Sequence, residues 1–349
     1  MKVFFITHTV KSKTGAGEFA ANLINSLTHA VPSIKLEIIT SENLNFFNLV
    51  KKAWKSDIIH AFDVYPYGVL AATANLLVRR PLMITAIGSG SLQPLHSRGV
   101  RLHLAKWACR KASRVTAISH YVAGEIRRIL PGLPVEVINP GVDYEFWSTG
   151  GQSGMEEKLA GLKPYLLTVG EFKRRKGYSE LLPVMKNIFS VFPDMKYIIV
   201  ADKDRNRKYF EELQGLIERL GIKDKITVLS DLAKKDLRAV YRNAVSYIIL
   251  PKNIGWDIEG FGMAVAEAAA SGLPAVVGRG SGSDDAIEDG ESGILVDPND
   301  TAEIFSFVSA VISSKARREK LSIGAKLFAQ KIKLSDQAKK YVIIYQSLL

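Results

Sequence analysis

Two glutamates eight residues apart, Glu259 and Glu267, are the side chains of this sequence best suited to chemistry. The apolar run 247–250 precedes them and predicts a buried strand. The alanine-rich stretch that follows Gly262 has helix propensity. Glu259 is therefore expected in the loop between a strand and a helix, and Glu267 is expected within that helix.

The glycines of this segment predict a ligand at the helix N-terminus. Gly260 and Gly262, with Phe261 between them and Met263 after them, allow backbone N–H groups to approach a ligand closely. Such groups and the helix dipole suit an anion such as a diphosphate. The two carboxylates would repel that anion, but they accept hydrogen bonds from neutral hydroxyls. A diphosphate joined to many hydroxyls describes a nucleotide-sugar.

A basic loop offers the cation that such a ligand needs. Lys176 follows a predicted strand, and its ammonium could stabilise the charge that develops on a leaving diphosphate. The alternative is a solvated cation in a basic loop. For Glu259 the alternative to a contact with donor-sugar hydroxyls is charge compensation at the helix N-terminus, worth ~0.3–1 kcal/mol. Gly15 and Gly17, after the first strand, could receive phosphate or form only a tight turn.

Short apolar strands alternate with helical patterns along the chain. Runs rich in Val, Ile and Leu with helices between them predict parallel sheets covered on both faces. Two such series predict an α/β protein with two doubly wound, Rossmann-like domains that face one another across a cleft. The predicted strands are Lys2–Thr7, Lys35–Thr40, Asp57–Phe62, Leu82–Ile87, Arg114–Ile118 and Pro134–Ile138, then Tyr165–Gly170, Lys196–Ala201, Lys225–Ser230, Ser246–Leu250, Leu273–Val277 and Gly293–Val296.

The domain boundary is predicted in the polar stretch 148–154, which contains three glycines. This places one domain at residues 1–150 and the other at 151–332. The last helix, 335–349, carries apolar residues at helical spacing, so we expect that stripe to be buried.

Composition narrows the class of protein. The 349 residues are 47% hydrophobic and 23% charged, which is typical of a folded globular chain. We expect no signal peptide, and no run approaches the ~20 apolar residues that span a bilayer. Cys109 is the single cysteine, so no intrachain disulfide can form, and a reduced, cytoplasmic setting fits. No Cys/His pattern predicts a metal site.

The net charge is +12, and most of it lies near the front of the chain. Residues 1–150 hold 17 Lys and Arg against 9 Asp and Glu. Such a surface could bind nucleic acid, an anionic membrane or a phosphorylated substrate, or it could be a solvated exterior. The basic residues are not interleaved with aromatics as base stacking needs, so nucleic acid is not expected.

One basic segment has two interpretations. Lys51, Lys52 and Lys55 flank Trp54 on a predicted helix that begins with Phe46 and Phe47. The helix could lie at an anionic membrane surface and serve a lipid or lipid-linked acceptor at the inner membrane face. Alternatively, Phe46, Val50 and Trp54 could pack on the sheet while the lysines point outward, which leaves a soluble acceptor as the expectation.

With these motifs in order along nearly the whole chain, the sequence resembles the retaining glycosyltransferases of the GT-B fold, in particular the family 4-like group called glycosyl transferases group 1. Each motif is weak alone, but their order and spacing together carry the resemblance. The matching segments are Thr14–Glu18, Asp57–Ala61, Asn139–Asp143 with Phe146, Val169-Gly170 with Lys176-Gly177, Glu259 with Glu267, and Asp297–Asp300.

The resemblance implies roles for these residues. Glu259 and Lys176 would be catalytic, in a transfer where the leaving phosphate takes the proton of the acceptor. The nucleotide-sugar donor would be bound by Gly15, Gly17, Arg175, Lys176, Glu259, Gly260, Phe261, Gly262, Met263 and Glu267. Lysine and arginine would replace a metal, so no metal or other cofactor is expected. The last helix, 333–349, would pack back on the first domain.

Two positions depart from the family pattern. Glu171 stands where the family often has an arginine, for which Arg174 or Arg175 could substitute. Ile87 stands where many members have a histidine near the donor sugar. Three alternatives stay open: an epimerase-like or phosphorylase-like enzyme of the same fold, of which the epimerase is disfavoured by the missing histidine, a basic binding protein without catalysis, and an inactive scaffold, which the two departures favour.

Overall fold

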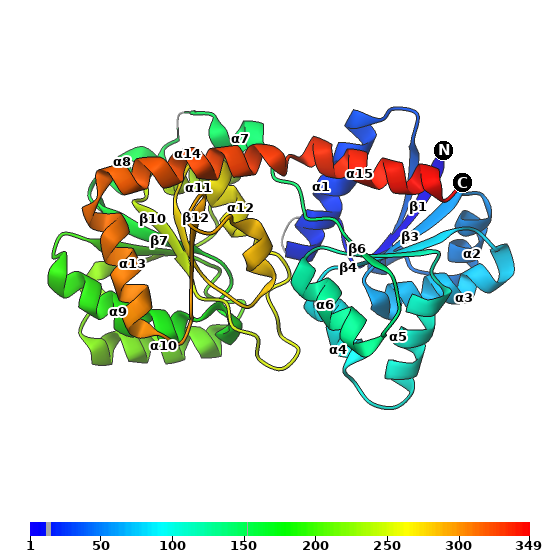
Figure 1. Ribbon diagram of the computed structural model, residues 1–349, viewed down its shortest axis with the longest axis horizontal. Coiled ribbons are helices and arrows are strands. Elements are labelled where there is room, and N and C mark those ends of the chain that lie inside the picture. The colour runs from blue at the N-terminus through cyan, green and yellow to red at the C-terminus, as the bar shows by residue number, and fades with distance from the viewer. Residues whose placement is uncertain (12–14, 152) are drawn as a thin grey trace. The chain divides into compact units, whose positions relative to one another are not determined.

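The computed structural model describes residues 1–11, 15–151 and 153–349, which form two compact units (Figure 1). Unit 1 contains Met1–Gly141 and Ile332–Leu349, and unit 2 contains Val142–Lys331. The division falls at Gly141, before the predicted boundary at residue 150. The helix α7 (Tyr144–Ser148) lies between these two positions, and its buried Trp147 packs edge-on against Tyr241 of unit 2.

Each unit is built on one parallel sheet of six strands, as the alternation of apolar runs predicts. The order in unit 1 is β2-β1-β3-β4-β5-β6, and in unit 2 it is β12-β11-β10-β7-β8-β9. The first-unit strands are β1 (Lys2–Thr7), β2 (Lys35–Thr40), β3 (Ile58–Phe62), β4 (Leu82–Ala86), β5 (Arg114–Ala117) and β6 (Val135–Val137). Those of unit 2 are β7 (Tyr165–Val169), β8 (Lys196–Val200), β9 (Ile226–Leu229), β10 (Ser246–Ile249), β11 (Ala275–Gly278) and β12 (Gly293–Val296).

Helices connect the strands and flank both sheets (Figure 1). In unit 1 they are α1 (Gly15–Ala30), α2 (Phe46–Trp54), α3 (Val69–Val78), α4 (Ser89–Leu95), α5 (Val100–Lys111), α6 (His120–Ile129) and α15 (Leu334–Ser347). Unit 2 adds α8 (Met155–Ala160), α9 (Tyr178–Val191), α10 (Arg207–Leu220), α11 (Lys234–Asn243), α12 (Met263–Ala270), α13 (Thr301–Ser313) and α14 (Lys315–Lys331). Short turns of 3-10 or π type are η1 (Ser41–Asn43), η2 (Val64–Gly68), η3 (Arg174–Lys176), η4 (Lys223–Lys225) and η5 (Gly282–Ala286).

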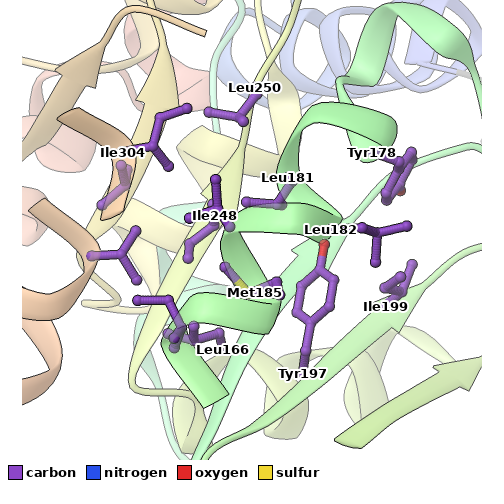
Figure 2. Packing of buried hydrophobic residues seen from close by; sticks show 14 of the residues in the cluster. Leu166, Tyr178, Leu181, Leu182, Met185, Tyr197, Ile199, Ile248, Leu250 and Ile304 are labelled. Atoms are coloured by element: carbon purple, nitrogen blue, oxygen red, sulfur yellow. The ribbon is translucent and has the colours of Figure 1, made fainter. Parts of the chain in front are cut away.

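The core of unit 2 lies between its sheet and the helices α9, α10 and α13. Leu181 and Met185 of α9 lie over Leu166 of β7 and Ile248 of β10, and all four are buried (Figure 2). Burying such side chains stabilises by about 1.5–3 kcal/mol each. The strands β7 and β10, which lead into the loops of the predicted site, thus contribute to one buried hydrophobic cluster.

The last helix completes the core of unit 1. Ala338, Tyr341 and Tyr345 are buried, as their spacing predicts, and Ile344 and Gln337 are buried with them. Tyr345 Oη lies 2.8 Å from Nδ1 of the buried His60, whose Nε2 lies 2.7 Å from Thr85 Oγ1. The apolar stripe of α15 therefore packs around a fully buried polar network at β3 and β4.

Candidate functional site

The strand order of unit 2 creates a switch point between β7 and β10. The chain continues from β7 to β8 and β9 on one side, while β10, β11 and β12 lie on the other. In open parallel sheets, ligands bind in the crevice at the carboxyl ends of the strands that flank such a point. The loop after β7 carries Lys176, and the loop after β10 carries Glu259.

The loop after β7 is pressed against the end of β10. Gly177, with φ of 71°, begins α9, and a Cβ atom at this position would lie 2.0 Å from the carbonyl oxygen of Leu250. Only glycine fits a positive φ at such close approach. The backbone N–H of Lys252 also donates to the carbonyl oxygen of Arg175, at 2.7 Å. These contacts bring Arg175 and Lys176 next to the loop of the glutamates.

The loop after β10 turns back before it enters α12. Ile254 and Asp257 exchange two backbone hydrogen bonds of 3.1 and 3.0 Å, which close a tight turn. The N–H of Gly282 then donates to the carbonyl oxygen of Glu259 at 2.9 Å and fixes that residue. Gly262, with φ of 84°, begins α12. Glu259 thus lies in the loop and Glu267 in the helix, where the sequence predicts them.

Two cations share one carboxylate oxygen in this site. Arg175 donates through Nη1 to Oε2 of Glu259, and Lys176 Nζ forms an ion pair with the same oxygen. A second carboxylate, Asp257, lies 2.9 Å from Arg175 Nε through Oδ1. Glu259 is only 8% exposed. Arg175, Lys176 and Glu259 therefore form an ion-pair network with little contact to solvent, in which charge interactions are strong, and the exposed Asp257 lies at its edge.

Burial and pairing together set the protonation states. Burial raises the pKa of Glu259, but the charges and hydrogen bonds of Lys176 and Arg175 outweigh it and lower that pKa to about 2. Burial lowers the pKa of the Lys176 ammonium, and the Glu259 carboxylate opposes part of that shift. At neutral pH Glu259 is a carboxylate and a weak base.

Glu267 lies on the buried face of α12. It is 6% exposed, and its Oε2 accepts a hydrogen bond of 3.0 Å from the Tyr241 hydroxyl. Burial raises the pKa of Tyr247 well above its usual range, and the charges of Glu259 and Glu267 raise it further. Tyr247 donates instead to the carbonyl oxygen of Val169, at 3.1 Å. Tyr247 therefore stays neutral beside the two glutamates, and Tyr241 donates to Glu267.

The structure separates the two arginines that could replace the missing family arginine. Arg174 pairs with Glu212 on α10 and lies over the Tyr209 ring, in an exposed position. Arg175 is mostly buried and belongs to the Glu259 network. Glu171 pairs with Lys173 and Arg205. Arg175 is thus the second cation of the candidate site.

Some site residues were missed or lie elsewhere. Ser283, missed from the sequence, is fully buried, and its Oγ has no hydrogen-bond partner in the described part of the chain. A Cβ atom on Gly262 would lie 2.5 Å from that Oγ, so the hydroxyl lies at the start of α12. No spacing rule pointed to it. Gly15 and Gly17 begin α1 in unit 1, so their part in the donor site stays a prediction. Thr14 lies outside the described residues.

Comparisons with known proteins cover both units. The family model "Glycosyl transferases group 1" matches residues 155–328, and "Glycosyltransferase Family 4" matches residues 2–146. An uncharacterised glycosyltransferase of Methanocaldococcus jannaschii is 24% identical over 88% of this chain and 81% of its own length. A GDP-mannose-dependent α-(1-6)-phosphatidylinositol monomannoside mannosyltransferase of Mycolicibacterium smegmatis is 25% identical over 74% of this chain and 70% of its own.

A solved structure has the same fold. The crystal structure of Anabaena HepE in complex with UDP matches with a TM-score of 0.83 at 20% identity, over 99% of this chain and 100% of that one. At this identity the likeness concerns the fold alone.

Proposed function

Because the chain belongs to the group 1 glycosyltransferases of the GT-B fold, we propose that it transfers a sugar from a nucleoside-diphosphate sugar to an acceptor hydroxyl with retention of configuration. The observation that supports this class of donor is the pair of buried cations, Lys176 and Arg175, beside two buried glutamates at the switch point of unit 2. The UDP complex of HepE supports a nucleoside diphosphate as part of the donor.

Each part of the donor has a partner of matching chemistry. Lys176 and Arg175 bind the diphosphate, together with backbone N–H groups of the glycine-rich turn from Gly260 to Met263 that leads into α12. The Ser283 hydroxyl lies at the same helix start and can donate a further hydrogen bond. Glu267 accepts hydrogen bonds from the ribose hydroxyls, and Glu259 accepts them from the sugar.

The catalytic work is electrostatic. As the bond between sugar and diphosphate breaks, negative charge grows on the leaving oxygen, and Lys176 and Arg175 stabilise it in a nearly dry site. These two cations take the part that a metal takes elsewhere, so we propose a transfer that needs no metal. Glu259 orients the sugar by accepting hydrogen bonds from its hydroxyls. The departing phosphate oxygen accepts the proton of the acceptor hydroxyl.

The exposed surface of α2 supports a lipid-linked acceptor. The buried residues of α2 are Leu49 and Ala53, whereas Phe47 is 85% and Trp54 is 63% exposed. The packing of Phe46 and Trp54 on the sheet, the soluble alternative, is therefore not what the structure has. Lys51 and Lys55 are exposed on the same helix. Basic and large apolar side chains together suit an anionic membrane surface.

A lipid acceptor also agrees with the mannosyltransferase of M. smegmatis, whose name describes a phosphatidylinositol mannoside acceptor. We propose that the enzyme works at the cytosolic face of a membrane as a peripheral protein. Among the described residues, no helix is long and apolar enough to cross a bilayer.

The test is a panel of nucleotide-sugars offered with and without extracted lipid acceptors. Release of nucleoside diphosphate identifies the donor, and the NMR coupling constant of the new anomeric proton gives its configuration. The proposal requires that at least one donor is turned over and that its anomeric configuration is kept. Inversion would refute the retaining mechanism, and no turnover of any donor would refute the donor class.

A further inference from the structure

The two cations of the donor site are already neutralised by the protein itself. Lys176 and Arg175 both reach Oε2 of Glu259, so one carboxylate oxygen pairs with two buried cations. Glu259 has its backbone fixed by the N–H of Gly282 and its side chain mostly buried, so this pairing is built into the loop. The carboxylate lies where the cations would hold another anion.

A diphosphate must compete with this carboxylate. Each cation prefers a charged acceptor, but two anions that share the same donors in a low-dielectric site repel one another strongly. Arg175 can release Glu259 without losing every partner, because Asp257 lies 2.9 Å from its Nε. When a diphosphate replaces Glu259, both cations therefore stay paired. The Glu259 carboxylate loses its hydrogen-bond donors and needs new ones.

Resting on the proposed function, we infer that Glu259 is an exchangeable counter-ion that makes the site prefer the intact donor over the nucleoside diphosphate product. An intact nucleotide-sugar displaces Glu259 from the cations and at once supplies sugar hydroxyls that satisfy its carboxylate. A nucleoside diphosphate displaces it in the same way but supplies none. A buried carboxylate without partners is unfavourable. Glu259 then reclaims Lys176 and Arg175, and the product leaves.

Removal of the charge of Glu259 and removal of the charge of Glu267 should have opposite effects on nucleotide binding. Glu267 accepts a hydrogen bond of 3.0 Å from the Tyr241 hydroxyl, which is not a group that a diphosphate would bind. Loss of charge at Glu267 should therefore only weaken nucleotide binding. Loss of charge at Glu259 should strengthen the binding of any ligand that brings a diphosphate without a sugar.

The experiment measures the affinity of inorganic pyrophosphate and of UDP or GDP, whichever the wild type binds more tightly, by calorimetry. Glu259→Gln should bind both at least about tenfold more tightly than wild type, a difference of ~1.4 kcal/mol. The matching nucleoside, which lacks phosphate, should bind both proteins equally. Glu212→Gln is the control, because it removes one negative charge from Arg174 in the same basic loop.

Equal or weaker binding of pyrophosphate by Glu259→Gln would overturn the counter-ion role, and so would an equal gain in Glu212→Gln. Glu259→Asp, which keeps the charge but shortens the side chain, should fall between wild type and Glu259→Gln. This variant decides the matter if Glu259→Gln does not fold, since binding weaker than wild type would then refute the inference. If wild type binds no nucleoside diphosphate at all, it is the proposed function that fails.

Discussion

Replacement of Lys176 by alanine is the sharpest test of the donor site. The variant removes one of two cations from a cluster in which Lys176 and Glu259 are both mostly buried. A hydrogen bond to a charged group is worth about 1.5–3 kcal/mol. With ~1.4 kcal/mol for each factor of ten, the affinity for a nucleoside diphosphate should fall roughly 10-fold to 150-fold. The turnover should fall at least as far, because charge on the leaving group grows towards the transition state.

The fold should survive this change. Breaking a buried ion pair costs ~3–5 kcal/mol when one charge is left alone, but Glu259 keeps Arg175 as its partner. Calorimetry with UDP and GDP gives the affinity, initial rates give kcat and KM, and urea unfolding gives the stability. Lys173→Ala is the matched control, because Lys173 lies in the same loop and pairs with Glu171 at a half-exposed position. Wild-type affinity and kcat in Lys176→Ala would refute the site assignment.

Three further predictions concern other parts of the chain. Glu267→Gln should weaken nucleoside diphosphate binding about tenfold, whereas Glu259→Gln should strengthen that binding and lower kcat; equal, wild-type binding in both would refute the division of roles. Burial lowers the pKa of His60 to about 3 from 6.5. Between these two pH values His60 is protonated in the unfolded chain but not in the folded chain. The free energy of unfolding should therefore fall by up to ~1.4 kcal/mol per pH unit as pH drops from 6.5 towards 3. Urea unfolding checks this, since His60→Gln should lose that part of the slope and the exposed His103→Gln should keep it. The double substitution Lys51→Glu and Lys55→Glu should reduce co-sedimentation with anionic vesicles at ~0.15 M salt, because each lysine near the surface contributes ~1 kcal/mol of binding. The control, Lys203→Glu with Lys208→Glu at two exposed positions in unit 2, should not reduce it. Wild type that fails to bind vesicles would favour a soluble acceptor.

Local pattern was sufficient for the strands and for the last helix. All twelve predicted strands are present and differ by at most two residues at an end, because buried parallel strands read as short apolar runs between helices. The buried stripe of α15 follows in the same way from its 3.6-residue period. For α2 the sequence predicted a helix but did not identify the face that is buried. The buried residues are Leu49 and Ala53.

The site depended on contacts between segments far apart in the sequence. Glu259 and Glu267 could be placed on a loop and a helix, but their partners come from other elements. Arg175 meets Glu259 because the sheet order sets β7 beside β10, and no local pattern encodes that order. Tyr241 and Ser283 are ordinary residues in their own segments, and only the packing around α12 brings them to the glutamates.

Every role proposed for the site depends on the binding of a nucleoside diphosphate to unit 2 through Lys176 and Arg175. The most direct measurement is calorimetric titration of wild type, Lys176→Ala and Arg175→Ala with UDP, GDP and ADP. We expect at least one of these nucleotides to bind wild type at one site per chain and to bind each variant about tenfold or more weakly. If wild type binds none of these nucleotides, or if both variants bind as tightly as wild type, this assignment of the site is wrong.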